Sequence, residues 1–217
     1  MKPLAAELAT AFLYPFRPMT LVVSLVVALF AGAAGFLPFG SLIGAGIRFA
    51  WLFAILRTAS VGSEDVAVDP SEISSSIVGW VGPAFRVFLA CLVAFLPAVM
   101  VALVLGESGM LGVAALGLAG GLYLPAALIV AAHDDRWLAP LNPAPAVMLI
   151  ARIPGSYFTA CAMLFVLFAL SGGVSAGAQR LDMGIVSSLL QWVLGFLPLV
   201  AAARMLGILV HEKREEL

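Results

Sequence analysis

The sequence predicts an all-α membrane protein with six transmembrane helices, from its composition and from the length of its uncharged stretches. Hydrophobic residues make up 63% of the 217 positions and charged residues 11%, whereas soluble domains carry about 45–50% and about 25%. Too few charges remain to cover the surface of a soluble fold. The net charge of −1 also excludes a strongly basic nucleic-acid-binding protein. The lipid bilayer is therefore the expected partner.

The six spans follow from the uncharged stretches and the turn residues between them, because a helix needs about 20 apolar residues to cross a bilayer. Turn chemistry at Leu37-Pro38-Phe39-Gly40 divides the first long apolar run in two. This run starts too late and is too long for a cleaved signal peptide, so we expect it to remain as a helix. The predicted spans are Met19–Phe36, Phe39–Leu56, Val87–Gly106, Ser108–Ala132, Ile153–Gln179 and Met183–Ala203.

The positive charges near the span ends predict that both termini are cytoplasmic, since Lys and Arg concentrate on the cytoplasmic side. With this orientation, Arg180 is the one exception among the 11 Lys and Arg residues. The cytoplasmic set is Lys2, Arg17, Arg48, Arg57, Arg86, Arg136, Arg152, Arg204, Lys213 and Arg214. The chain is therefore predicted to be a multi-pass protein whose polar residues lie mostly on one side.

Three proline pairs of similar spacing predict a threefold internal repeat, because each pair precedes an odd-numbered span. The pairs are Pro3 and Pro15, Pro70 and Pro83, and Pro143 and Pro154. We expect each pair to bracket a short elbow helix that lies in the cytoplasmic interface and leads into a transmembrane hairpin. The single membrane domain, 1–217, then consists of repeat units 1–62, 63–135 and 136–217.

Arg48 and Arg204 are candidate anion-binding or lipid-binding residues, because a charge inside a span is costly unless it is paired or hydrated. The six predicted spans contain no Asp or Glu that could pair with Arg48. Alternatively, Arg48 extends toward the cytoplasmic interface or bonds to backbone carbonyls near Gly44 and Gly46. The same alternatives apply to Arg204, which lies closer to an interface.

The stretch His133-Asp134-Asp135-Arg136 is the densest polar cluster and a weaker candidate site in a cytoplasmic loop. Carboxylates beside a histidine can hold a metal ion or a magnesium-bound phosphate. No second acidic cluster has a matching spacing, so a solvated loop is the simpler interpretation. We predict no metal site and no cofactor.

The sequence lacks the motifs that would indicate an enzyme. It contains no His-Glu-x-x-His, no Gly-x-Ser-x-Gly and no Walker loop, so we predict no catalytic residues. Cys91 and Cys161 lie in apolar runs and are expected to pack as small hydrophobic residues. Three prolines inside the predicted spans are expected to produce simple kinks. They are Pro97, Pro125 and Pro198.

The C-terminal part of the chain resembles a group of bacterial six-span membrane proteins that carry a domain of unknown function. The resemblance lies in the ending from Ala203 to Leu217 and in Leu141-Asn-Pro143, followed by Arg152-Ile-Pro-Gly-Ser-Tyr157. The group is similar in layout to Yip-type membrane proteins. The resemblance implies a location in the bacterial inner membrane, and it implies no activity and no site residues.

Two functions are compatible with these patterns. The first is a non-enzymatic inner-membrane protein that acts as a scaffold or as a subunit of a membrane assembly. Its cytoplasmic face would then contact other membrane or cytoplasmic proteins. The second is a small transporter or lipid-handling protein in which Arg48 and Arg204 face an anionic group.

Overall fold

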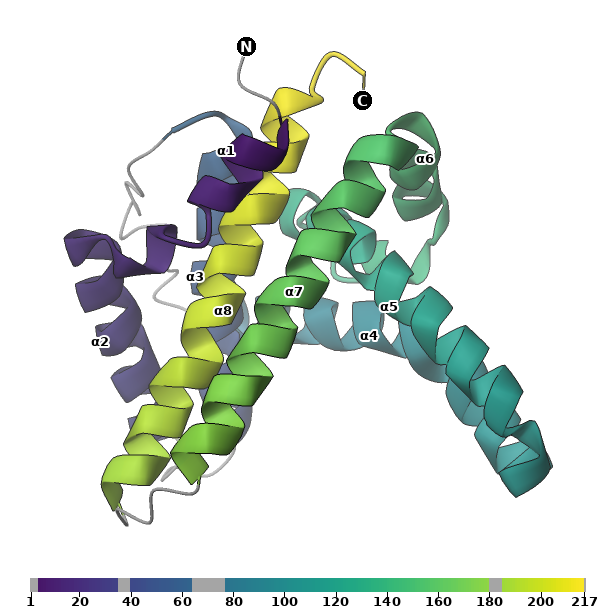
Figure 1. Ribbon diagram of the computed structural model, residues 1–217, viewed down its shortest axis with the longest axis horizontal. Coiled ribbons are helices and arrows are strands. Elements are labelled where there is room, and N and C mark those ends of the chain that lie inside the picture. The colour runs from purple at the N-terminus through teal and green to yellow at the C-terminus, as the bar shows by residue number, and fades with distance from the viewer. Residues whose placement is uncertain (1–3, 35–39, 64–76, 180–184, 217) are drawn as a thin grey trace.

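The computed structural model describes residues 4–34, 40–63, 77–179 and 185–216, and these residues form helices and no strands (Figure 1). The long helices are α2 (Pro18–Ala34), α3 (Gly40–Ser60), α4 (Ile77–Leu105), α5 (Met110–His133), α7 (Pro154–Gln179) and α8 (Ile185–Glu212). The short elements are α1 (Leu4–Thr10), η1 (Tyr14–Phe16), η2 (Gly106–Gly109), η3 (Ala139–Leu141) and α6 (Ala144–Arg152). The prediction of an all-α fold is confirmed.

Five apolar segments in the described part of the chain are each long enough to cross a membrane. They are Gly40–Ser60, Val81–Leu105, Met110–His133, Pro154–Val174 and Gly195–Glu212. A sixth span results if Leu4–Phe16 and Pro18–Gly32, which are bent by 61° relative to each other, are taken together. The protein is therefore a multi-pass membrane protein with five or six spans. The helix at the predicted first span, α2, has 17 residues in the described part of the chain, at the lower end of the roughly 17–25 that a crossing uses.

The three predicted elbow helices differ in the structure. Short helices α1 and α6 precede α2 and α7, and each of these long helices begins at a proline, Pro18 or Pro154, the residue favoured in a first helical turn. The middle pair departs from the prediction, because Pro83 lies inside α4 and no helix ends there. Pro70 and the start of that predicted elbow lie outside the described residues. A proline inside a membrane helix is tolerated where neighbouring groups satisfy the freed carbonyl.

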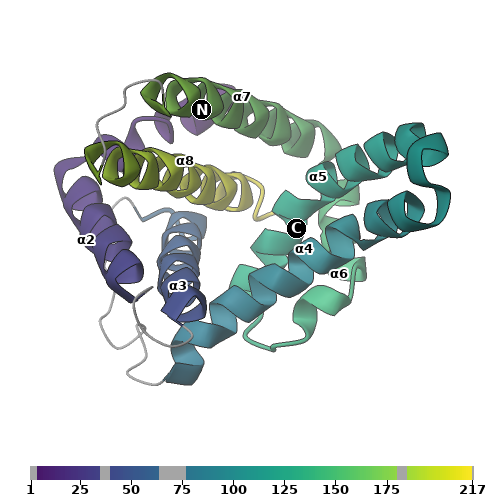
Figure 2. The same cartoon turned by 90° about the horizontal axis from the view of Figure 1, so that it is seen from below.

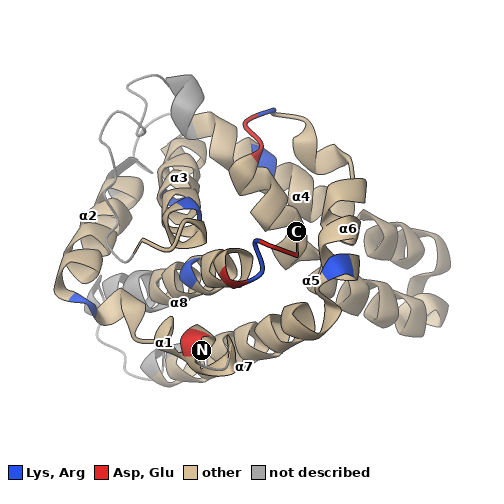
Figure 3. Cartoon of the chain, turned by 90° about the horizontal axis from the view of Figure 1, so that it is seen from above, with Lys and Arg blue, Asp and Glu red and all other residues tan. Residues whose placement is uncertain are grey.

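The helices form a bundle in which α3 packs against α2, α4 and α8, while α4 pairs with α5 and α7 pairs with α8. Figures 1 and 2 show the outer ends of α4 and α5 leaning away from the other helices. Helix α1 and the end of α8 lie at the same end of the bundle (Figure 1). Figure 3 shows this end, with charged residues on α3, α4, α6 and α8.

Two glycines allow the closest approaches between helices. A Cβ atom at Gly207 of α8 would collide with the Leu56 carbonyl and with Ala59 of α3. A Cβ atom at Gly120 of α5 would collide with the Ala94 carbonyl of α4. Small residues at such crossings let membrane helices gain packing contacts, which replace the hydrophobic driving force of soluble folds. These contacts hold α3 against α8 and α4 against α5, and thereby position the site described next.

Candidate functional site

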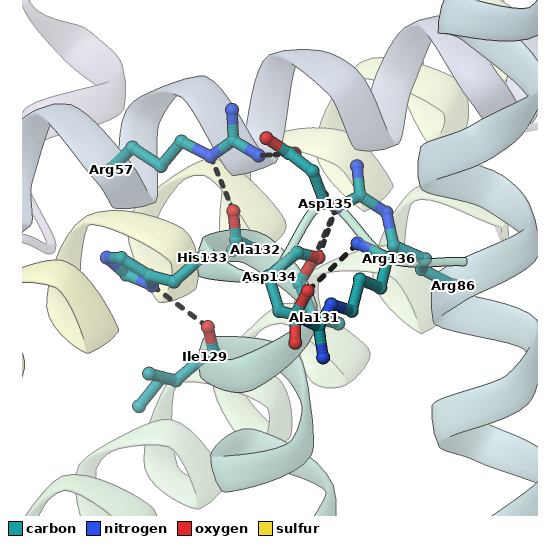
Figure 4. Close-up of polar contacts among 9 residues, drawn as sticks. All are labelled: Arg57, Arg86, Ile129, Ala131, Ala132, His133, Asp134, Asp135 and Arg136. Atoms are coloured by element: carbon teal, nitrogen blue, oxygen red, sulfur yellow. Dashed lines mark hydrogen bonds and ion pairs between the residues drawn. The ribbon is translucent and has the colours of Figure 1, made fainter. Parts of the chain in front are cut away.

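Arg57, Arg86 and Asp135 form a charged cluster where the last turn of α3 and the end of α5 meet the first half of α4, and we call it the arginine cluster (Figure 4). Arg57 Nη2 lies 2.8 Å from Asp135 Oδ1, and Arg86 Nη1 lies 3.3 Å from the same oxygen. The Arg86 side chain is 8% exposed, whereas that of Asp135 is 82% exposed. Two guanidinium charges therefore share one solvent-exposed carboxylate.

The two arginines also close the C-terminal end of α5. Arg57 Nε donates to the Ala132 carbonyl at 2.5 Å, and Arg86 Nη1 donates to the carbonyls of Ala131 at 3.0 Å and Asp134 at 2.7 Å. The last carbonyls of a helix have no donor within the helix, and they carry the negative end of its dipole. Cations placed there join three helices by satisfying these acceptors.

His133 and Asp134 from the predicted polar loop lie beside this cluster and make local contacts. His133 Nδ1 lies 2.9 Å from the Ile129 carbonyl, so this nitrogen carries a hydrogen, because a carbonyl can only accept. Its other ring nitrogen, Nε2, lies 3.1 Å from Ser60 Oγ on α3. Asp134 Oδ1 accepts the backbone N–H of Arg136 at 2.9 Å, as is typical of a turn. These residues therefore fix the loop that follows α5.

The same loop borders an open pocket of about 580 Å³ at the end of the bundle. The pocket is lined by Ile129, Val130, His133, Asp134, Asp135, Arg136, Leu149 and Val210. Among the residues that the structure describes, no three His, Cys, Asp or Glu side chains are grouped so that they could hold a metal ion. The pocket thus gives the exposed face of Asp135 access to solvent.

Arg204 and Arg48 lie elsewhere in the bundle. Arg204 on α8 donates from Nη1 to the Ser63 carbonyl at 2.6 Å, and its Cζ lies 4.9 Å from the centre of the Tyr14 ring. It therefore connects α8 to the end of α3 and to the N-terminal segment. Arg48 is half-buried on α3, nine positions before Arg57, which is roughly 13 Å along a helix. Neither residue lines the cavity described next.

An apolar cavity of about 480 Å³, the interhelical cavity, lies among α3, α4, α5, α7 and α8. Its lining is Phe49, Leu52, Phe53, Leu56, Val87, Gly117, Leu118, Gly121, Leu122, Leu124, Pro125, Leu128, Cys161, Leu164, Phe165, Phe168, Leu199, Ala202, Ala203 and Leu206. All these positions lie within the apolar spans. The cavity is therefore at the level of the bilayer.

The cavity is open to the outside of the bundle between α5 and α7. Two of its lining side chains are largely exposed, Leu118 of α5 at 71% and Phe165 of α7 at 76%. Gly117 and Gly121 contribute no side chain, and a Cβ atom added at either position would meet no atom within 4 Å. Lipid chains in the surrounding bilayer can therefore reach the cavity from the side.

The cavity and the arginine cluster are adjacent. Leu56 and Val87 line the cavity and are the immediate chain neighbours of Arg57 and Arg86. The ring of Phe53 also lines the cavity, and its centre lies 5.4 Å from Arg86 Cζ, within the range of a cation–π contact. The apolar cavity and the arginine cluster thus adjoin along α3 and α4, although Asp135 itself faces the open pocket at the end of the bundle.

The wall of the cavity on α5 includes a helical turn that also bonds to a side chain of α7. Ala126 N–H donates to Tyr157 Oη at 3.0 Å, and Tyr157 Oη donates to the Leu122 carbonyl at 2.5 Å. Leu122 and Ala126 are four positions apart and would normally bond directly. Pro125 has no N–H and so cannot bond to the Gly121 carbonyl. The Tyr157 hydroxyl from α7 bonds to both backbone groups of this turn, beside the proline.

The sequence singled out Asp135 but missed Arg57, Arg86 and Tyr157 as members of one site. The two arginines served only as orientation signals, because residues at span ends are expected there whatever they contact. Comparison with protein-family models, with curated proteins and with solved structures gave no match.

Proposed function

We propose that this is a non-enzymatic membrane protein that binds the hydrocarbon chain of a membrane lipid in the interhelical cavity. The observation that carries the proposal is an apolar cavity of about 480 Å³ that opens sideways at the level of the bilayer. Ligand pockets usually measure about 300–1,000 Å³, so the cavity is large enough for a small ligand or a lipid chain. This proposal is the lipid-handling alternative, with the binding region at different residues from Arg48 and Arg204.

The chemistry of the lining favours a hydrocarbon chain over a polar solute. The side chains around the cavity are aliphatic or aromatic, apart from the thiol of Cys161, and a polar group buried there without a hydrogen bond would cost roughly 2–7 kcal/mol. A lipid tail carries no such cost. Because the bilayer is also apolar, the gain on binding comes from close packing and not from the release of water.

Filling the cavity tests the proposal. We expect Gly121→Leu to reduce the lipid retained by the purified protein roughly tenfold, equivalent to about 1.4 kcal/mol, because the new side chain occupies the space that the tail needs. The substitution meets no atom at its Cβ, so the fold is expected to survive. The measurement is native mass spectrometry of the protein released from nanodiscs.

Gly172→Leu is the matched control for this experiment. Gly172 lies on α7, has no atom within 4 Å of an added Cβ, and does not line the interhelical cavity. The same change of residue at this position should leave the retained lipid at the wild-type level. Equal retention by both variants and the wild type would contradict the proposal.

A second candidate function is that of a subunit in a larger membrane assembly, through which it would act as a scaffold. It is favoured by the outer part of the α4–α5 hairpin, which leans away from the other helices (Figure 2). There Leu103, Val104 and Leu111 are 76%, 72% and 88% exposed, so another membrane helix could pack on them. Native mass spectrometry also tests this second function. A second protein at a fixed stoichiometry would support the assignment as a subunit, and a lone chain would count against that assignment.

We also propose that the end of the bundle with the arginine cluster faces the bacterial cytoplasm. Support comes from the excess of Lys and Arg assigned to this side. A green fluorescent protein fused at the C-terminus should therefore fluoresce, and an alkaline phosphatase fused there should be inactive. An active phosphatase would show that the C-terminus lies outside the cytoplasm and that the proposed orientation is wrong.

A further inference from the structure

We propose that the arginine cluster binds the phosphate of a lipid headgroup and that Asp135 occupies the phosphate position until a lipid displaces it. The inference rests on the proposed function, because it concerns the headgroup of the lipid whose tail lies in the interhelical cavity. Its basis is that Arg57 directly follows Leu56 and Arg86 directly precedes Val87, two residues that line that cavity. Arg86 also contacts the ring of Phe53, which lines the cavity as well.

The arginine cluster contains more positive than negative charge in direct ion pairs. Among the described residues, Arg57 and Arg86 share a single carboxylate oxygen of Asp135. The side chain of Asp134 is close enough to attract Arg86 electrostatically, but its Oδ1 accepts the Arg136 N–H, and the hydrogen bond from Arg86 goes to the backbone carbonyl of Asp134. A phosphate would supply more charge and more acceptor oxygens, and the planar guanidinium group is well suited to bind it in a bidentate manner.

Arg86 also has an unused donor in a buried position. Its side chain is 8% exposed, and its Nε has no hydrogen-bond partner among the residues that the structure describes. A buried donor without a partner is unfavourable. Nε lies on the other edge of the guanidinium group from Nη1, which makes the contacts with Asp135 and with the carbonyls at the end of α5. Burial of the whole side chain distinguishes Arg86 from an arginine that merely extends to the interface.

Asp135 is suited to be displaced. Its side chain is 82% exposed, and water can solvate the carboxylate when it leaves, because exposed ion pairs contribute little net free energy. Arg86 remains bound to the Ala131 and Asp134 carbonyls throughout. The cationic position is therefore fixed while its internal anion is easily exchanged.

The test compares two lipids with identical chains, dioleoyl phosphatidate and dioleoylglycerol, binding to the purified full-length protein in detergent. We expect the wild type to prefer phosphatidate. Asp135→Asn should raise the affinity for phosphatidate about tenfold, the scale of one charge-assisted hydrogen bond, and should leave dioleoylglycerol binding unchanged. Misfolding cannot cause a gain in affinity.

Glu216→Gln is the matched control, because it removes one negative charge from an exposed ion pair with Lys213. It should leave both affinities at the wild-type value. A phosphatidate affinity that rises equally in both variants would assign the gain to net charge and overturn the inference.

The remaining outcomes separate the two proposals. If the wild type binds the two lipids equally and Asp135→Asn changes nothing, the headgroup site is wrong while lipid binding in the cavity stands. If the wild type binds neither lipid, the proposed function itself fails. If inorganic phosphate binds with the same dependence on Asp135 but does not compete with phosphatidate, the site takes free phosphate, and the assignment to a lipid is overturned.

Discussion

Arg86→Met is expected to lower the free energy of unfolding by about 3 kcal/mol, because hydrogen bonds to charged groups contribute about 1.5–3 kcal/mol. The substitution removes the guanidinium group that donates hydrogen bonds to the Ala131 and Asp134 carbonyls, and it removes the cation at the end of α5. The contact with Asp135 adds little to this loss, since that carboxylate is 82% exposed and screened by water. The measurement is the midpoint of thermal unfolding in detergent.

Two further variants make this experiment specific. Arg86→Lys keeps the charge but lacks the forked donor, so it should recover only part of the stability. Arg152→Met removes an exposed cation from the last turn of α6 and should leave the midpoint within the range of ordinary surface substitutions. A wild-type midpoint for Arg86→Met would show that the arginine does not hold the ends of α4 and α5 together.

The spans were predictable because burying a charge in a bilayer is costly, so membrane-spanning segments appear in the sequence as long uncharged stretches. The ends of the helices were less predictable, since a charge can end an apolar span without ending the helix. Helix α8 continues past Ala203 to Glu212, and α4 is already helical at Ile77, before the predicted start at Val87. Both added segments overlap the apolar spans Val81–Leu105 and Gly195–Glu212. Arg86 and Arg204 therefore lie inside apolar helices that continue on both sides of the charge.

The arginine cluster could not be derived from the sequence, because its members are remote from one another along the chain. Asp135 is 78 positions from Arg57 and 49 positions from Arg86. No local pattern in the sequence predicts that the last turn of α3 and the end of α5 meet the first half of α4. Arg48 shows the opposite case. The sequence singles it out because a charge within a span is costly and marks a candidate functional site, but it does not line the interhelical cavity.

Pro125 was expected to produce a simple kink, and the structure shows how that region of α5 is completed. The sequence indicates which carbonyl loses its donor, but it does not indicate which side chain bonds to the backbone nearby. Tyr157 does so from α7, 31 positions away from Ala126. The packing of α7 against the rest of the bundle therefore determines the local structure of α5.

Tyr157→Phe is expected to lower the free energy of unfolding by about 2 kcal/mol, because it leaves the Leu122 carbonyl and the Ala126 N–H without the hydroxyl that joins them. Tyr157 is fully buried, so water cannot replace the hydroxyl from solvent. The measurement is again the thermal midpoint in detergent.

Tyr123→Phe is the matched control, since it deletes a hydroxyl from α5 for which no hydrogen-bond partner is found among the described residues. Its midpoint should stay close to that of the wild type. Equal midpoints for both variants would mean that Leu122 and Ala126 do not depend on the Tyr157 hydroxyl. The cavity wall would then not depend on α7, whereas a loss confined to Tyr157→Phe would show that α7 fixes the shape of α5 where the lipid tail is proposed to bind.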